Sequence, residues 1–221
     1  MKTIVKVKDV AQLTHNVKRF TVERPDNYEF TPGQATHVSI NKEGWEEEDR
    51  AFTFTCLPDA KDLEFTIKIY PDHNGVTDQL NKIKPGDELI LREVNGAIEY
   101  KGPGYFIAGG AGITPFIAIF RELERKGELD DNILIFSNKT DKDIILKKEL
   151  DKKLGHNVTY VITNQDDTEY TQGYIDEEFL RNTITDLTKH FYVCGPKPMT
   201  KEINKILEKI GATTDELVFE Q

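Results

Sequence analysis

Residues 105–116 read Tyr-Phe-Ile-Ala-Gly-Gly-Ala-Gly-Ile-Thr-Pro-Phe, and this stretch decides how the second half of the chain is expected to fold. Its first four residues are typical of a short apolar strand, and the glycines after them form a turn whose backbone can approach a neighbouring group closely. Thr114 is expected to cap the following helix, and Pro115 suits the first turn because its missing N–H has no partner inside a helix. The free N–H groups at such a helix start favour an anion, which indicates a dinucleotide. A tight packing corner without a ligand is the alternative.

The composition excludes several classes of partner. The 221 residues are 38% hydrophobic and 31% charged, which is typical of a globular protein with one large or two small domains. Because 29 basic and 39 acidic residues give a formal net charge of −10, we expect neither nucleic acid nor a membrane surface as a partner. No apolar run approaches the roughly 20 residues that span a bilayer, and the alternating N-terminus is typical of a strand and not of a signal peptide. We therefore expect a cytoplasmic protein.

Metal-ligating residues are few and scattered. Cys56 and Cys194 are the only cysteines, which excludes a disulfide framework and is too few for a four-cysteine zinc or iron–sulfur site. The five histidines show no ligand spacing. The sequence therefore predicts no metal site.

The two halves of the chain differ in the period of their hydrophobic residues. Up to about residue 100, short β-rich runs between turn residues predict an antiparallel barrel or sandwich, interrupted by one helix near 76–83. Residues 101–104, Lys-Gly-Pro-Gly, suit neither a strand nor a helix, so we expect domains at 1–101 and 102–221. Beyond this boundary strands alternate with helices, which predicts a parallel sheet with helices on both faces. The expected strands are 105–108, 132–136, 158–162 and 190–193, and the expected helices are 115–126, 144–153, 176–185 and 198–210.

Three segments of the second domain directly follow predicted strands. They are Gly109–Thr114, Ser137–Lys139 and Cys194–Met199. Because ligands of a parallel sheet bind at the carboxyl ends of its strands, these segments are expected to meet at one edge and form a site. Ordinary turns of an α/β fold are the alternative.

Two segments of the first domain offer groups for a nucleotide. In Arg50-Ala51-Phe52-Thr53 the guanidinium suits a pyrophosphate, the phenyl ring offers a flat face, and the hydroxyl can meet a ring nitrogen. In Gly75-Val76-Thr77 the glycine permits close approach, and the hydroxyl and helix N–H groups suit a phosphate. Taken alone, an ordinary strand and a simple helix cap are the better interpretations.

Taken together, these segments resemble the ferredoxin–NADP reductase superfamily of flavin-dependent oxidoreductases, in family order and over nearly the whole chain. The resemblance implies a six-stranded antiparallel flavin-binding barrel followed by a Rossmann-like parallel-sheet domain for a nicotinamide nucleotide. Phe52 stands where the family usually has tyrosine, which keeps the stacking face and removes a hydroxyl. The matching segments are Pro32-Gly33-Gln34, Arg50-Ala51-Phe52-Thr53, Gly75-Val76-Thr77, Gly109–Pro115, Cys194-Gly195-Pro196 and Phe219-Glu220-Gln221.

The resemblance also implies a role for each flavin-side segment. Arg50, next to Ala51, would bind the flavin pyrophosphate, Phe52 would stack on the isoalloxazine, and Thr53 would hydrogen-bond near N5. The strand Lys68-Ile69-Tyr70 would lie along the ring or its ribityl chain. Gly75, Val76 and Thr77 would hold the pyrophosphate, which favours FAD over FMN.

On the nicotinamide side, the resemblance implies contacts from the three strand ends. Phe219 would cover the flavin until the nicotinamide displaces it, with Glu220 close by, so that Thr53, Cys194, Phe219 and Glu220 are the residues expected at the reacting rings. The residues implied to bind the nicotinamide nucleotide are Gly110, Gly112, Ile113, Thr114, Pro115, Ser137, Asn138, Lys139, Cys194, Gly195, Pro196 and Met199.

The implied activity is hydride transfer from NAD(P)H to FAD, followed by release of electrons one at a time to an acceptor. Because the chain lacks the four cysteines of a fused plant-type ferredoxin, we expect a separate acceptor such as ferredoxin or flavodoxin, which would dock on a local basic patch. A flavin-binding electron-transfer subunit that is active only within a larger complex is the alternative, and a nucleotide-binding protein without flavin is a third interpretation.

The sequence leaves the choice between NADH and NADPH open. Ser137 and Lys139 suit a 2′-phosphate, whereas Asp141 and Asp143 would repel one. The segment 138–144 also resembles NADH-using cytochrome b5 reductases.

Overall fold

The computed structural model describes residues 2–96, 98–213 and 217–218. Backbone contacts divide the chain into two compact units. Unit 1 contains the described residues of Met1–Ala97 together with Thr114–Glu122, and unit 2 contains those of Ile98–Ile113 and Leu123–Gln221. The limits expected from the sequence, 1–101 and 102–221, stay a prediction.

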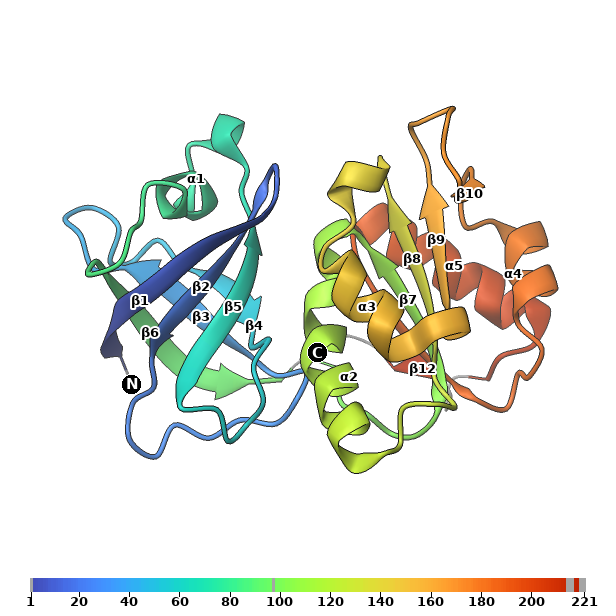
Figure 1. Cartoon of the computed structure of the whole chain (residues 1–221), viewed down its shortest axis with the longest axis horizontal. Helices are drawn as coiled ribbons and strands as arrows, with labels where there is room; N and C mark the ends of the chain where they lie inside the picture. Colours follow the sequence, from blue (N-terminus) through green and yellow to red (C-terminus); the bar gives the residue numbers. More distant parts are fainter. Residues whose placement is uncertain (1, 97, 214–216, 219–221) are drawn as a thin grey trace. The chain divides into compact units, whose positions relative to one another are not determined.

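Unit 1 is built on a six-stranded antiparallel sheet, which confirms the predicted fold class. Its strands follow the order β4-β3-β6-β1-β2-β5. An antiparallel bridge between Phe54 and Phe65 joins the two outer strands, so the sheet closes on itself as a barrel. The elements, blue to green in Figure 1, are β1 (Thr3–Thr14), β2 (Val17–Glu23), β3 (Ala35–Ile40), β4 (Arg50–Thr53), β5 (Asp62–Lys68), a 3₁₀ turn (Pro71–His73), α1 (Val76–Leu80) and β6 (Glu88–Asn95).

The core of unit 1 follows from the alternation of side chains along each strand. Val5 and Val7 are 2% and 1% exposed, and the lysines beside them lie at the surface. Aromatic rings fill the centre, where Phe54 stacks on Phe30 at a centroid distance of 4.2 Å. Helix α1 adds Val76 and Leu80 to this core and ends at Leu80, earlier than the predicted residue 83.

Unit 2 is built on a six-stranded parallel sheet, again as predicted. Its strands follow the order β10-β9-β8-β7-β11-β12. Figure 1 shows α3 (yellow) in front of this sheet and α5 (red) behind it. The strands are β7 (Gly104–Gly109), β8 (Ile133–Asn138), β9 (Val158–Ile162), β10 (Thr171–Gln172), β11 (His190–Cys194) and β12 (Leu217–Val218). The helices are α3 (Lys147–Leu154), α4 (Glu177–Thr183) and α5 (Lys197–Ile210), with 3₁₀ turns at Gly110–Ile113, Asp141–Asp143 and Gly155–Asn157. Helix α2 (Thr114–Lys126) belongs to unit 1 up to Glu122 and to unit 2 from Leu123.

The predicted helix ends are partly correct. Gly211 ends α5 in the left-handed conformation, with φ of 112°, which confirms its predicted role as the C-terminal cap. The predicted N-terminal cap of α2 is wrong. Ile113 already has helical dihedral angles and precedes the helix as its cap residue, so Thr114 lies inside the first turn. Its hydroxyl instead accepts a hydrogen bond from the Thr53 hydroxyl at 2.8 Å.

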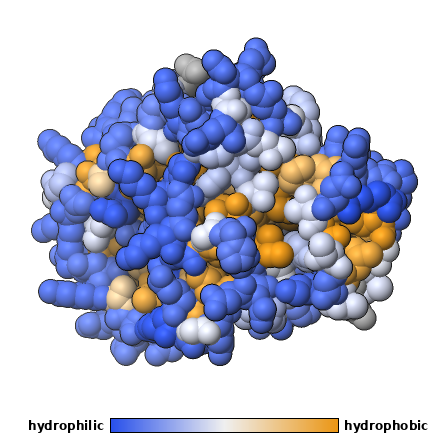
Figure 2. Space-filling view, turned by 45° about the vertical axis from the view of Figure 1, so that its right-hand side comes forward, coloured by the Kyte–Doolittle hydropathy of each residue, from blue (hydrophilic) through white to orange (hydrophobic). Residues whose placement is uncertain are grey.

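Most of the visible surface is hydrophilic (blue in Figure 2), as expected for a chain with 31% charged residues. Hydrophobic residues (orange) show in limited patches. Among the described residues, the large hydrophobic side chains with high exposure are Ile4 at 56%, Tyr70 at 41% and Tyr174 at 75%.

One polar cluster ties α2 to the barrel within unit 1. Arg121 donates from Nη1 to the Thr55 carbonyl at 2.5 Å and to Glu64 Oε1 at 2.7 Å. The Thr55 hydroxyl donates to the same carboxylate oxygen at 2.8 Å. The Arg121 and Glu64 side chains are each 18% exposed, so loss of one charge would leave the other poorly solvated.

We expect Arg121→Met to lower the free energy of unfolding by about 2 kcal/mol, because it leaves the largely buried Glu64 carboxylate to the more distant Arg19, whose Nε lies 3.8 Å from Oε2. Chemical denaturation of the purified chain measures this change. Arg181→Met is the matched control, since its pair with Glu177 is more exposed, at 51% and 32%, and its loss should leave the midpoint within error. Equal effects of the two substitutions would contradict this account.

Candidate functional site

The predicted edge of strand ends forms in unit 2. Strands β7, β8 and β11 are neighbours in the sheet, with Gly109 opposite Ser137 and Ala108 opposite Cys194. The three segments that follow these strands therefore lie at one edge, as expected from the sequence. This confirms the predicted arrangement of the strand ends.

Two glycines of the turn after β7 are required by packing. A Cβ atom on Gly109 would lie 2.4 Å from Sδ of Met199, and one on Gly112 would lie 2.3 Å from the Cys194 carbonyl oxygen. Real Cβ atoms do not approach other atoms so closely. At Gly112 the neighbour is backbone, so that position admits only glycine, whereas at Gly109 the end of the Met199 side chain would have to move. Both neighbours belong to the end of β11 or the first turn of α5, which supports the packing-corner alternative at these two positions.

Gly110 differs from its neighbours. It has a φ of +51°, in the left-handed region that glycine adopts without strain, and nothing lies within 4 Å of the position of a Cβ atom. The space that a Cβ atom would occupy is therefore empty at Gly110, whereas it is filled at Gly109 and Gly112. This open backbone, directly before the N-terminal end of α2, fits a nucleotide phosphate.

A cavity of about 570 Å³ lies at the same edge of unit 2. The sequence analysis selected Ser137, Pro196 and Met199, and all three line it. It missed the wall formed by the segment after β10, which starts with the exposed ring of Tyr174. The complete lining is Ser137, Thr163, Tyr174, Ile175, Asp176, Glu177, Pro196, Pro198, Met199, Glu202, Ile203 and Ile206.

The charged residues that line this cavity are all acidic. Asp176 caps α4 by accepting a hydrogen bond from the Phe179 amide at 2.8 Å. Hydrogen bonds from Lys209 and Arg181 hold the pKa of Glu177 below its usual range. Glu202 is exposed on α5, and its nearest cation is Lys205 at 4.0 Å. The cavity therefore presents carboxylates, and no lysine or arginine, to a ligand.

Asn138, at the end of β8, is the most unusual predicted residue. Its side chain is 4% exposed, and neither amide atom has a hydrogen-bond partner among the described residues. An unpaired buried amide costs free energy, which a bound water or ligand group can recover. The neighbouring Ser137 lines the cavity, and Lys139 is exposed beside it.

The two cysteines are both buried. Cys194 is 6% exposed at the end of β11, the strand end at which the sequence pattern predicted it, and its role at the nicotinamide stays a prediction. Cys56 lies in unit 1, and burial raises the pKa of its thiol to about 11. Cys56 is therefore a neutral thiol at physiological pH.

In unit 1, β4 presents the predicted arginine to solvent. Arg50 is exposed, and its Nη1 donates to the Asp49 carbonyl at 2.6 Å. Its remaining N–H groups have no hydrogen-bond partner among the described residues, which fits a residue that binds a pyrophosphate. Ala51 is exposed and Phe52 is half-buried, whereas Thr53 is 9% exposed and donates to Thr114.

The segment after β5 offers an aromatic face. Tyr70 stacks on His73 with ring centroids 5.3 Å apart and an interplanar angle of 8°. The Lys68 ammonium lies 6.0 Å from the centre of the Tyr70 ring, whereas Ile69 is 5% exposed and belongs to the core. An exposed ring pair of this kind can take a further planar group by stacking.

Gly75 is the cap residue at the start of α1, as the simple-cap alternative expects, and no side chain closes the first turn. Val76 is buried as part of the core. The Thr77 hydroxyl has no hydrogen-bond partner among the described residues, so it stays available to a phosphate. Its role in binding remains a prediction.

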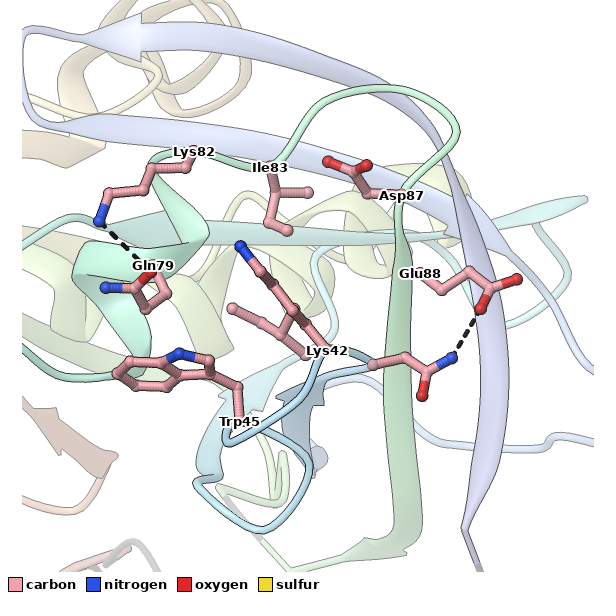
Figure 3. A pocket seen from close by; sticks show the side chains of 9 residues that line it. Lys42, Trp45, Gln79, Lys82, Ile83, Asp87 and Glu88 are labelled. Carbon is pink, nitrogen blue, oxygen red and sulfur yellow. Dashed lines mark hydrogen bonds between the residues drawn. The ribbon is translucent and has the colours of Figure 1, made fainter.

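A second cavity, of about 290 Å³, lies near the other end of α1 and contains none of the predicted residues. Figure 3 shows Trp45 and Lys42 facing Gln79 of α1, with Glu88 on the far side. Asn41 donates from Nδ2 to Oε2 of Glu88 at 2.6 Å. The remaining lining residues of this cavity are Ile40, Lys82, Ile83 and Asp87.

The remaining predictions concern the C-terminal residues, metal ligands and membrane-spanning helices. Phe219 and Glu220, predicted at the reacting rings, lie outside the described residues. Within the described part of the chain, no three His, Cys, Asp or Glu side chains gather as metal ligands. None of the described helices is long and apolar enough to cross a bilayer.

Comparison with known proteins assigns a family to each half. Residues 4–100 match the oxidoreductase FAD-binding domain family, and residues 106–205 match the oxidoreductase NAD-binding domain family. The chain is 32% identical to NADH-cytochrome b5 reductase 1 of Aspergillus clavatus, over 94% of this chain and 74% of that protein.

Solved structures show the same fold. The FAD/NAD-binding domain of nitric oxide dioxygenase from Vibrio cholerae superposes with a TM-score of 0.86 at 19% identity, covering 98% of this chain and 97% of that one. A ferredoxin NADP+ reductase from Neisseria gonorrhoeae, crystallised with FAD and NADP, superposes with a TM-score of 0.83 at 23% identity, covering 95% and 92%. The chain therefore belongs to the ferredoxin–NADP reductase-like family of oxidoreductases with an FAD-binding and an NAD-binding domain, as an FAD-dependent NAD(P)H oxidoreductase similar to the cytochrome b5 reductases.

Proposed function

We propose that this oxidoreductase uses NADH and delivers electrons to a separate small redox protein of the cytochrome b5 or ferredoxin kind. The proposal rests on two sites, one in each unit, that are suited to bind a nucleotide. Arg50 offers free guanidinium N–H groups on the barrel, and an acidic, ring-bearing cavity opens at the carboxyl edge of the parallel sheet. The chain is similar to NADH-cytochrome b5 reductase 1, whose name supports both NADH as the donor and a small redox protein as the acceptor.

The residues of unit 1 would hold FAD by complementary donors and faces. Arg50 and the Thr77 hydroxyl would bind its pyrophosphate, and Phe52 and Tyr70 would contact its planar rings. The Thr53 hydroxyl, held in place by Thr114, would be fixed in orientation before the cofactor arrives. When bound, FAD supplies the chemistry, since it accepts a hydride and releases electrons singly.

The residues of unit 2 would hold the dinucleotide donor. The open backbone at Gly110 would meet the phosphates, and Cys194, Gly195 and Pro196 would border the nicotinamide. The exposed ring of Tyr174 is suited to stack on the adenine. The carboxylates of Asp176, Glu177 and Glu202 would tolerate a ribose hydroxyl and repel a 2′-phosphate, which favours NADH over NADPH.

The purified chain should be yellow, and anaerobic NADH should bleach its visible flavin band. It should then reduce ferricyanide alone, and reduce added cytochrome b5 or ferredoxin with a rate that falls as ionic strength rises, because docking of charged proteins is screened by salt. A preparation that stays colourless after incubation with FAD would refute the flavin assignment. Activity only with a further subunit would instead favour the electron-transfer-subunit alternative.

We expect Arg50→Ala to weaken FAD binding by at least tenfold, because it removes charge-assisted hydrogen bonds to the pyrophosphate that contribute about 1.5–3 kcal/mol. Titration of the apoprotein with FAD measures the change. Arg181→Ala, in unit 2, is the control and should leave FAD affinity unaltered. Unchanged flavin affinity in Arg50→Ala would count against the assigned role.

Reversal of one charge in the cavity tests the donor preference. Glu202→Lys should raise kcat/KM for NADPH roughly tenfold and change that for NADH much less, because one repulsion of the 2′-phosphate becomes an attraction. Glu208→Lys makes the same charge change on α5 outside the cavity lining, so it should move neither constant. A native preference for NADPH, or equal effects of the two variants, would overturn the proposal.

A further inference from the structure

Asp49, the residue directly before the predicted pyrophosphate ligand, is held by two basic side chains. Arg92 on β6 donates from Nε to its Oδ2 at 3.0 Å, and Nδ1 of His37 on β3 lies 2.7 Å from its Oδ1. Both carboxylate oxygens are therefore engaged from different strands. The Asp49 side chain is 26% exposed and that of Arg92 is 19% exposed, which makes this pair much better shielded than an ordinary surface ion pair.

Arg92, which holds Asp49 from β6, is itself held in place by further contacts. Arg92 also donates from Nη2 to the Glu46 carbonyl at 3.0 Å, so one guanidinium holds both ends of the segment 46–49. Its backbone N–H and carbonyl both bond the hydroxyl of the buried Thr36, at 3.2 and 2.9 Å. The pairing of β3 with β6 shifts register between Thr36 and Val38, where Arg92 and Glu93 of β6 stand opposite His37 alone, which marks a bulge on β6 at Arg92. Bulges re-aim side chains and are common beside functional sites.

The same segment fixes the predicted ligand of the pyrophosphate. Arg50 Nη1 donates to the backbone carbonyl of Asp49 at 2.6 Å, so the position of its guanidinium depends on where that carbonyl points. The carbonyl in turn is fixed because the Asp49 side chain is tied to β3 and β6. A continuous set of contacts therefore leads from the barrel wall to the guanidinium.

A carboxylate so close to an anion site would ordinarily weaken it. Hydrogen bonding from His37 holds the pKa of Asp49 below its usual range, so the group is ionised at neutral pH. Its charge is balanced by the Arg92 guanidinium, which leaves the charge of Arg50 available to a phosphate. The cluster can thus provide rigidity without cancelling the local positive charge.

We propose that Asp49 is a positioning residue for FAD binding, which acts through Arg50 and is itself held by Arg92 and His37. This inference rests on the proposed role of Arg50 at the FAD pyrophosphate. It predicts that loss of the Asp49 anchor weakens the contact to phosphate selectively and leaves binding of the isoalloxazine portion intact.

The test measures the affinities of the apoprotein for FAD and for riboflavin, which lacks the phosphates. Asp49→Asn should weaken FAD binding about fivefold to tenfold and leave riboflavin binding unchanged, because a loosened side chain loses its geometric match to the pyrophosphate. Arg92→Met should give the same selective loss, and Arg92→Lys should restore part of it. Asp62→Asn is the matched control, since it removes a carboxylate paired with Lys8 in the same unit, and it should change neither affinity.

A double-mutant cycle separates positioning from general stability. If Asp49 acts through Arg50, Asp49→Asn should have less than about a twofold further effect on FAD affinity in an Arg50→Ala background. Multiplicative effects, or equal losses for FAD and riboflavin, would overturn the inference while the role of Arg50 stands. If Arg50→Ala alone leaves FAD affinity unchanged, the proposed pyrophosphate contact is wrong and this inference falls with it.

Discussion

The contact of two turns, in which backbone packs on backbone with no room for a side chain, determines the edge of the parallel sheet. Gly112 lies against the carbonyl of Cys194, and a Cβ atom on Gly195 would lie 3.1 Å from the backbone N and Cα of Gly109. This contact fixes the end of β7 beside the end of β11, with β8 on its other side. The cavity, the open backbone at Gly110 and the acidic wall all depend on that arrangement.

An acidic chain that binds two anionic dinucleotides needs hydrogen-bond donors without other partners at the places where the phosphates bind. The net charge of −10 makes the average surface repulsive to phosphate. Arg50 on β4 offers guanidinium N–H groups without a partner among the described residues, and the space beside the half-buried Gly110 backbone is open. Under the proposed function, the carboxylates around the 570 Å³ cavity of unit 2 would serve selection and not affinity, because they would oppose one additional phosphate and leave a hydroxyl unaffected.

Much of the fold could be predicted from the sequence. Before about residue 100 the hydrophobic pattern is that of successive short strands, and after it strands alternate with helices. In addition, the carboxyl ends of parallel strands necessarily meet at one edge of their sheet. Details that depend on contacts distant in sequence could not be predicted. The Thr114 hydroxyl meets Thr53, 61 positions earlier, and no local pattern reveals that. Likewise Gly109 and Gly112 look like ligand-approach glycines in sequence, and only their neighbours identify them as packing glycines.

The missed wall of the cavity has a similar cause. Tyr174 and Asp176 follow β10, a strand of two residues that carries no readable alternation, and Glu202 is one of several charged residues on an amphipathic helix. A rule that asks which residues follow every strand of the sheet, β9 included, would have included Thr163. The exposed ring of Tyr174 becomes informative only once its exposure is known.

The cavity near α1 has a practical consequence through Trp45. The chain has a single tryptophan, and it belongs to unit 1. Its ultraviolet emission therefore reports on the barrel alone, whereas the shorter-wavelength tyrosine signal comes mainly from unit 2, which holds six of the eight tyrosines, all but Tyr28 and Tyr70. Melting of the two halves can be followed in one sample without attaching a label, and the order in which they lose structure becomes directly observable.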